Sequence, residues 1–206
     1  MPPECSCNLS SHAPRLVVFT GGPGAGKTTA LDVARRAFCK HVVVLPESAT
    51  LLYGGGFPRK STLPTRRAAQ RAIFHVQHEL EQAALEEGQA AVVLCDRGLL
   101  DGLAYWPDDE ASFFASVRTT RDAVLARYAA VVHLRVPGDG DGYDHKNPLR
   151  IETPDQARAL DGRTFAAWAG HPRRVEINST HDFMEKIRRA IAVVRAEIPG
   201  CCATAE

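Results

Sequence analysis

Residues 21–29, Gly-Gly-Pro-Gly-Ala-Gly-Lys-Thr-Thr, are the stretch whose residue types and spacing indicate a chemistry most directly. They match the phosphate-binding pattern G-x-x-x-x-G-K-[ST], which here begins at Gly21 and ends at Thr28. Glycines let backbone N–H groups wrap a polyphosphate, because they carry no Cβ. Lys27 would reach the β- and γ-phosphates, and the Thr28 hydroxyl would ligate Mg²⁺. The motif predicts a nucleoside triphosphate site, with contacts from Gly22, Gly24, Ala25, Gly26, Lys27, Thr28 and Thr29.

The elements around this motif are those that a phosphate loop requires. Arg15–Thr20 before it is a short apolar run that predicts a buried strand. Thr28–Phe38 after it has apolar residues at helical spacing, which predicts a helix. The positive end of this helix and its free N–H groups would face the phosphates. This agreement favours a true phosphate loop over a chance glycine-rich turn.

Acidic residues follow two further apolar runs. Glu47 comes just after the run His41–Leu45, and Asp96 comes just after Ala90–Leu94. Continuous apolar runs are typical of parallel strands, and open α/β sheets bind ligands at the carboxyl ends of their strands. Asp96 therefore has the position of a Walker B carboxylate, which would hold Mg²⁺ directly or through water; a surface turn is the alternative. Asp101 is a second carboxylate near this edge, and we assign it to the substrate.

The segment of about 137–164 is rich in arginine and glycine and differs in character from its neighbours. Arg150, Arg158 and Arg163 lie on and around a short helix that should begin near Thr153. A mobile arginine-bearing segment suits a lid that closes over transferring phosphate, and a solvated helix is the alternative.

The remaining periodicity predicts the elements that hold these residues. Thr65–Glu87 should be a long helix that buries a stripe containing Ile73, Val76 and Leu80, with Gln77 beside the stripe and facing a cleft, where we assign it to the substrate. One or two helices should lie within 112–128, and a strand with a core histidine, His133, should follow. The last elements should be a short strand at 175–177 and a helix over 182–198 that buries Phe183.

Composition limits the class of protein. The 206 residues suit one domain, at 15–198, between a disordered tail at 1–14 and a tail at 199–206. The net charge of +1 disfavours nucleic acid as a partner. No apolar run approaches the roughly 20 residues that span a bilayer, and no signal peptide is evident, so we expect no membrane association and a cytoplasmic location.

Four of the six cysteines lie near the ends of the chain, at Cys5, Cys7, Cys201 and Cys202. A zinc site built from both ends is conceivable, but the C-x-C and C-C spacings are not the usual C-x₂-C. Reduced thiols on mobile tails are therefore the favoured interpretation. Cys95 ends an apolar run and should be a core residue.

Taken together, these motifs resemble the P-loop kinases of nucleosides and nucleoside monophosphates. The chain is most similar to a family of small AAA-type ATP-binding proteins allied to ribosylnicotinamide kinase. The matching motifs are F-T-G-G-P-G-A-G-K-T-T at 19–29, Glu47, Asp96-Arg97-Gly98 with Asp101, and His-Pro-Arg at 171–173. The resemblance covers most of residues 15–198 and implies a three-layer α/β/α P-loop NTPase with a five-stranded parallel sheet in the order 2-3-1-4-5.

The resemblance also implies roles for individual residues and ATP as the nucleotide. In deoxynucleoside kinases the glutamate after strand two acts as base on the substrate hydroxyl, and here the match is Glu47. The arginine after the strand-three acid touches phosphate or substrate, and here the match is Arg97. Gly98 departs from the serine of deoxynucleoside kinases and the aromatic residue of thymidylate kinases, so substrate identity does not transfer.

These inferences favour ATP- and Mg²⁺-dependent phosphoryl transfer to a nucleoside-like or nucleotide-like acceptor, with ATP hydrolysis as the fallback activity. The catalytic set would be Lys27, Glu47, Asp96, Arg97, Arg150, Arg158 and Arg163. The alternative is a nucleotide-binding regulatory ATPase that acts as a switch on a protein partner. A guanine-specific GTPase is disfavoured because N-K-x-D is absent from the sequence, and a nucleic-acid end kinase is disfavoured by the near-neutral charge.

Overall fold

A five-stranded parallel sheet forms the centre of the computed structural model, which describes residues 5, 7–9, 11–137, 153–179 and 182–202. The strands lie in the order β2-β3-β1-β4-β5, which confirms the predicted order. Their bounds are β1 Arg15–Thr20, β2 Val42–Leu45, β3 Val92–Asp96, β4 Tyr128–Leu134 and β5 Arg174–Ile177. Because all the strands run the same way, their carboxyl ends share one edge of the sheet.

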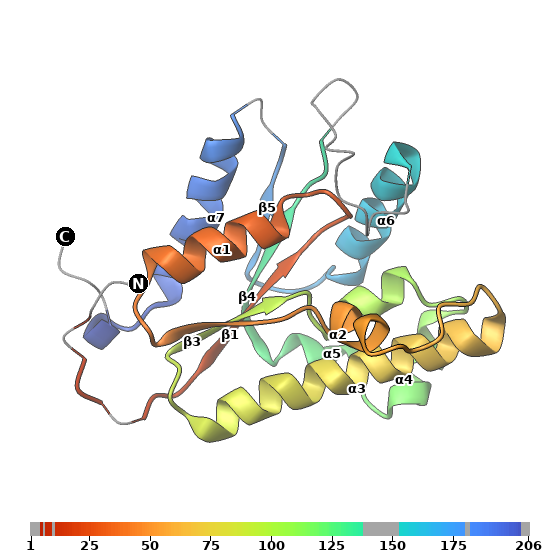
Figure 1. The fold of residues 1–206 in the computed structure, drawn as a ribbon, viewed down its shortest axis with the longest axis horizontal. Coiled ribbons are helices and arrows are strands. Elements are labelled where there is room, and N and C mark those ends of the chain that lie inside the picture. The colour runs from red at the N-terminus through yellow and green to blue at the C-terminus, as the bar shows by residue number, and fades with distance from the viewer. Residues whose placement is uncertain (1–4, 6, 10, 138–152, 180–181, 203–206) are drawn as a thin grey trace.

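Helices cover both faces of this sheet (Figure 1). One face packs against α1 (Lys27–Ala37) and α7 (Phe183–Glu197). The other packs against α3 (Leu63–Glu87), η1 (Leu99–Ala104), α4 (Glu110–Val117), α5 (Arg121–Leu125) and α6 (Pro154–Ala167). Alternate residues of a strand point to opposite faces, so Val17 and Phe19 join the first core while Leu16 and Val18 join the second. Cys95 is fully buried in the second core, which confirms its predicted place.

The long helix α3 buries a different face from the one that its apolar residues predict. Its buried residues are Ala69, Gln70, Phe74, Gln77 and Glu81, whereas Ile73, Val76 and Leu80 are only half-buried. The carboxylate of Glu81 accepts hydrogen bonds from Gln77, from the Tyr128 hydroxyl and from Arg127. Buried polar groups are stable when they are paired, and partners distant in sequence make this polar face a core face.

Two short helical segments lie where the sequence predicted loops or nothing regular. Helix α2 (Ser48–Gly54) follows Glu47 directly and packs beside α3 (Figure 1). The 3₁₀ segment η1 follows the carboxyl end of β3 and packs against α6. Both begin at the carboxyl edge of the sheet, so they bring further side chains to the predicted site. Within the described ranges, no helix is both long and apolar enough to span a membrane.

Candidate active site

The phosphate loop connects β1 to α1 at the carboxyl edge of the sheet. Gly21, Gly24 and Gly26 have φ angles of 130°, 82° and 93°, which side chains with a Cβ disfavour. A Cβ on Gly21 would also lie 2.1 Å from the carbonyl oxygen of Leu134. These glycines are therefore required both by their backbone conformation and by the closeness of β4.

Lys27 carries the cation of this loop and is largely buried, with 8% of its surface exposed. Its Nζ donates hydrogen bonds of 2.9 Å to the carbonyl oxygens of Gly21 and Gly22. Burial and the neighbouring charge of Arg97 together lower the pKa of Lys27 to about 8, against the opposing effect of the nearby carboxylates. The amine is thus held inside the loop and remains mostly protonated at neutral pH.

Asp96 and Thr28 are the oxygen-bearing residues placed to hold a hard cation. Burial and the negative charges of Glu47 and Asp101 together raise the pKa of Asp96 to about 6, although Lys27 and Arg97 oppose the rise. Among the described residues, no hydrogen bond or ion pair occupies the Asp96 carboxylate, and Thr28 is exposed. A carboxylate and a hydroxyl are ligands that Mg²⁺ accepts, so these two residues fit the predicted metal.

Arg97 links the loop to the ends of β2 and β3. Its Nε donates to Glu47 Oε1 at 2.6 Å, and its Nη1 donates to Asp101 Oδ1 at 3.0 Å and to the Gly21 carbonyl at 3.3 Å. Its φ of 71° is unusual for a residue with a side chain. Such strain persists only where the surroundings impose it, and it is frequent at functional sites.

Glu47 lies between the end of β2 and the start of α2. Its Oε2 accepts a 2.6 Å hydrogen bond from Thr50, and its Oε1 accepts from Arg97. Burial alone would raise the pKa of Glu47, but the charge of Arg97 and these hydrogen bonds outweigh it and lower the pKa. The carboxylate is therefore ionised at neutral pH, and each oxygen keeps a lone pair for a further donor.

Asp101 and Gln77, which the sequence assigned to the substrate, are both buried. Asp101 is buried, and its two oxygens accept hydrogen bonds from Thr20 Oγ1, Arg97 Nη1, Gly98 N and Trp168 Nε1. The buried Gln77 accepts from Ser48 and donates to Glu81. Because their polar groups are already paired within the protein, this geometry favours positioning roles over the substrate contacts that the sequence suggested.

The described arginines of the predicted lid, Arg158 and Arg163, make different contacts. Arg158 pairs with Asp155 on the surface of α6. Arg163 donates to the carbonyl oxygen of Ala104 at 3.0 Å and so joins α6 to η1. Arg150 lies outside the described residues. In the described part of the chain, neither this ion pair of Arg158 nor this hydrogen bond of Arg163 involves the phosphate loop.

Asp161 is the residue of α6 that does reach the phosphate loop, and the sequence analysis did not select it. Its Oδ1 accepts from Gly22 N at 2.9 Å and from His133 Nε2 at 3.0 Å, and its Oδ2 lies 3.1 Å from Arg135 Nε. His133 is fully buried, which confirms it as a core histidine. A Cβ on Gly22 would lie 2.8 Å from α6, so helix and loop are in close contact. Asp161 is far from its partners Gly22 and His133 in the sequence, so no local sequence pattern could have identified it.

We expect Asp161→Ala to destabilise the protein by about 2–4 kcal/mol, because it leaves the buried imidazole of His133 and the Gly22 N–H without their carboxylate partner. Hydrogen bonds from His133 and Gly22 help to lower the pKa of Asp161, so this stabilisation is present at neutral pH and is lost on strong acidification. Urea unfolding at pH 7 measures the change. Asp155→Ala, on the exposed side of α6, is the matched control and should change stability by less than about 1 kcal/mol. Equal stabilities of the two variants would contradict the role of Asp161.

The opposed pKa changes of Asp96 and Lys27 predict a bell-shaped dependence of kcat/KM on pH. The rate should rise as Asp96 ionises near about pH 6 and fall as Lys27 loses its proton near about pH 8. Initial rates at Mg-ATP concentrations well below KM across this range measure both limbs. In Asp96→Asn the residual activity should lose the acid limb and keep the alkaline one. A wild-type profile that is flat between about pH 5.5 and 9 would contradict both assignments.

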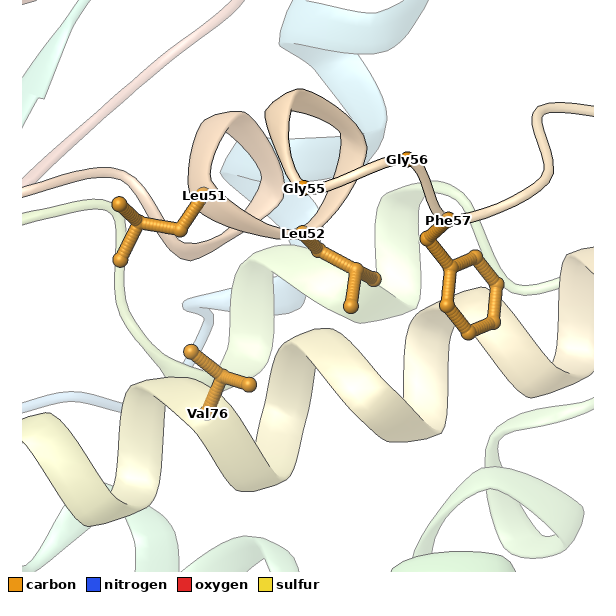
Figure 2. A pocket seen from close by; sticks show the side chains of 6 residues that line it. All are labelled: Leu51, Leu52, Gly55, Gly56, Phe57 and Val76. Carbon is orange, nitrogen blue, oxygen red and sulfur yellow. The ribbon is translucent and has the colours of Figure 1, made fainter.

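A shallow apolar pocket of about 460 Å³ lies between α2 and α3. It is lined by Leu51, Leu52, Gly55, Gly56, Phe57 and Val76, and Figure 2 shows Leu52 and Phe57 directed towards α3, which carries Val76. It is separate from the phosphate loop, but α2 begins immediately after Glu47. The pocket therefore lies at the end of α2, and Glu47, the predicted base, immediately precedes the start of the same helix.

Phe183 is a second residue near the loop that the sequence misplaced. It was expected in the core, yet 44% of its surface is exposed, because it lies in the first turn of α7. Its ring approaches Gly26, where a Cβ would lie 2.8 Å from the ring edge. An exposed aromatic ring beside the start of α1 is suited to stack on a planar group of a bound nucleotide.

The glycine loop on the first of five parallel strands, the lysine within it and the acid that ends β3 define a P-loop nucleotide-binding protein with a kinase-like fold. The family comparison agrees with this class. A model described as an AAA domain, AAA_28, matches residues 16–186, and the chain belongs to this family. No curated protein matches the chain.

Two solved structures share the fold. The structure of NadR protein in complex with NAD and AMP-PNP has a TM-score of 0.62 at 13% identity and covers 94% of this chain. The chain spans 51% of NadR, about half of its length. Thymidylate kinase from Candida albicans has a TM-score of 0.54 at 14% identity, with 90% of this chain and 93% of the kinase covered. At these identities, the similarity demonstrates a common fold.

Proposed function

We propose that this protein transfers the γ-phosphoryl group of ATP to a small acceptor, nucleoside-like or nucleotide-like. The observation that carries this proposal is the ion pair between Glu47 and Arg97, whose guanidinium also reaches the Gly21 carbonyl of the phosphate loop. A carboxylate held in this way beside a triphosphate site can receive the proton of an attacking hydroxyl. The names of the two similar structures agree with this, since one binds NAD and AMP-PNP and the other is a thymidylate kinase.

Each residue of the site has a defined part in this proposal. Lys27 and the loop N–H groups hold the β- and γ-phosphates in line with the acceptor. Arg97 stabilises negative charge at the transferring group, and Asp101 and Thr20 fix its position. Glu47 orients the acceptor hydroxyl and accepts its proton. Mg²⁺ held by Thr28 and Asp96 would supply further charge neutralisation at the phosphate oxygens.

The acceptor would lie along α2, between Glu47 and the apolar pocket lined by Leu51, Leu52 and Val76 (Figure 2). Apolar and aromatic side chains are typical of surfaces that hold a planar organic group. The segment of about 137–164 would exclude water, and Asp161, which lies in both this segment and α6, contacts the loop. A near-neutral protein is better suited to a small acceptor than to a nucleic acid.

The direct test is ADP release from Mg-ATP, alone and with nucleosides, nucleoside monophosphates and nicotinamide riboside, with Lys27→Ala as the blank. We expect one class of acceptor to stimulate turnover and to gain the mass of a phosphoryl group. Slow, acceptor-independent hydrolysis with tight ATP binding would overturn the transferase proposal in favour of a nucleotide switch. The absence of ATP binding would overturn both.

A further inference from the structure

Both ends of the described chain meet at the amino edge of the sheet, on the far side from the phosphate loop (Figure 1). Strand β1 starts three residues after His12 and runs about 20 Å to the loop at about 3.3 Å per residue. Five of the six cysteines of the chain gather here with two histidines, Cys5, Cys7, His12, Cys39, His41, Cys201 and Cys202. The sequence favoured reduced thiols on mobile tails over a site built from both ends; in the structure the thiols are free, but those of both ends lie together with Cys39.

The cluster consists of two groups of four that share one residue. The first group is Cys5, Cys39, His41 and Cys202, and the second is Cys7, His12, Cys201 and Cys202. Within each group the sulfur and nitrogen atoms lie within 4.8 Å of one another. Two tetrahedral ions that share a bridging sulfur need seven ligand residues, which is the number gathered here.

The distances within the first group are close to those of a tetrahedral metal site. Zn–S bonds of about 2.3 Å and Zn–N bonds of about 2.0 Å place sulfur and nitrogen about 3.5 Å apart around the ion, and two sulfurs about 3.8 Å apart. His41 Nδ1 lies 3.3 Å from Cys5 Sγ, 3.4 Å from Cys202 Sγ and 3.9 Å from Cys39 Sγ.

The second group has the same geometry. His12 Nε2 lies 3.3 Å from both Cys7 Sγ and Cys202 Sγ, and the sulfurs of Cys201 and Cys202 are 3.9 Å apart. The ring centroids of His12 and His41 are 4.7 Å apart, on either side of the shared Cys202. Each imidazole therefore presents a nitrogen to its own set of sulfurs.

Backbone hydrogen bonds from the domain hold these ligands in place. The Ala91 and Val92 amides donate to the carbonyl of His41, which lies between α1 and β2. The His12 amide donates to Gly88 at the end of α3, and the Cys202 amide donates to Pro199. Cys39 and Cys202 are each only 2% exposed, so the centre of the cluster is shielded from water. Preorganised, shielded ligands are typical of structural metal sites, whose ions have no open coordination position.

We propose that this cluster binds two zinc ions, bridged by the Cys202 thiolate, and that the ions fasten both ends of the chain to the domain. The thiolate-rich, tetrahedral ligand set selects zinc over the oxygen-seeking Mg²⁺ of the nucleotide site. Binding would release the thiol protons and stabilise the folded state. The site does not depend on the proposed transferase activity, since no ligand belongs to the phosphate loop.

The test is the metal content of the full-length protein, purified without a polyhistidine tag and dialysed against metal-free buffer. We expect two zinc ions per chain by mass spectrometry. Replacement by Co²⁺ should give the intense d–d absorption of tetrahedral sites and a thiolate-to-cobalt charge-transfer band. Cys7→Ser should retain one ion and Cys202→Ser neither. Cys95→Ala and His78→Ala alter a cysteine and a histidine outside the cluster, and both should retain two.

Thermal unfolding separates a structural metal from an adventitious one. A zinc-selective chelator should lower the Tm by several degrees, while ATP binding with added Mg²⁺ should change by less than about twofold. Less than one zinc per chain, or zinc that survives in Cys202→Ser, would overturn the proposal. Disulfides among these cysteines, or iron with inorganic sulfide, would overturn it too, and a single ion would contradict the shared sulfur.

Discussion

Lys27→Ala is expected to reduce ATP turnover by about 10²–10³-fold while the protein stays folded. The variant removes the cation that lies inside the phosphate loop, 2.9 Å from two loop carbonyls. The pKa of the wild-type Lys27 amine is lowered to about 8 in the folded state. The charged amine therefore destabilises the fold below that pH, and this destabilisation disappears at high pH. Without nucleotide at pH 7, the variant should therefore unfold at the same or a higher temperature than the wild type.

Mg-ATP should raise the Tm of the wild type and leave that of Lys27→Ala nearly unchanged, because a ligand stabilises only the state that binds it. Lys40→Ala is the matched control: Lys40 is exposed between α1 and β2, and its loss should leave turnover unaltered. Unchanged turnover in Lys27→Ala would exclude the loop as the triphosphate site. A variant that fails to bind ATP but also unfolds early would instead point to a structural role.

Glu47→Gln should lower kcat for phosphoryl transfer by about 10²–10³-fold and change the affinity for ATP by less than about twofold. Glutamine keeps the volume of the side chain and an oxygen for the Thr50 hydroxyl, but it cannot accept a proton. Burial raises the pKa of the native carboxylate, but Arg97 and the hydrogen bonds outweigh burial and lower it, which favours the ionised form that a proton acceptor requires. Single-turnover rates with the activating acceptor separate the chemical step from binding.

Glu87→Gln, at the exposed end of α3, is the control for this variant. The loss of charge at Glu47 also frees Arg97 from one of its two ion pairs. Arg97→Lys tests this second effect, because lysine keeps the charge but cannot bind Glu47 and Asp101 with separate nitrogens. A normal kcat in Glu47→Gln would remove Glu47 from the chemistry, whereas a defect equal to that of Arg97→Lys would assign it to positioning Arg97.

The parts of the molecule that the sequence predicted correctly are those encoded by local patterns. The strand order and the phosphate loop depend on apolar runs, glycines and a family motif, each contained in a few consecutive residues. Glu47 was selected by its place after a strand and Arg97 through the family resemblance, and the structure brings them together. Directions of side chains beyond the end of a strand cannot be deduced in this way: Asp101, in η1, was assigned to the substrate, and in the structure it is buried and accepts a hydrogen bond from Trp168.

The errors concern polar groups whose partners are distant in sequence. Helix α3 buries Glu81 because two residues pair with its carboxylate: Tyr128, the first residue of β4, and Arg127, which precedes β4. Asp161 reaches Gly22 across 139 positions of sequence. Periodicity treats every charged residue as exposed, so it assigns such residues to the wrong face. The cysteines show the same limit, since a site that joins both ends of a chain has no characteristic spacing.

The opposite pKa changes of Lys27 and Asp96 also determine how the heat of binding should depend on the buffer. Anionic phosphate restores the proton affinity of Lys27, so nucleotide binding near pH 8 takes up a fraction of a proton. A cation lowers the proton affinity of Asp96, so metal binding near pH 6 releases a fraction of a proton. In calorimetry, the measured heat of binding would therefore depend on the ionisation enthalpy of the buffer. The dependence would have opposite signs for the nucleotide and for the metal. Nucleotide and metal added together at neutral pH would exchange few protons with the solvent.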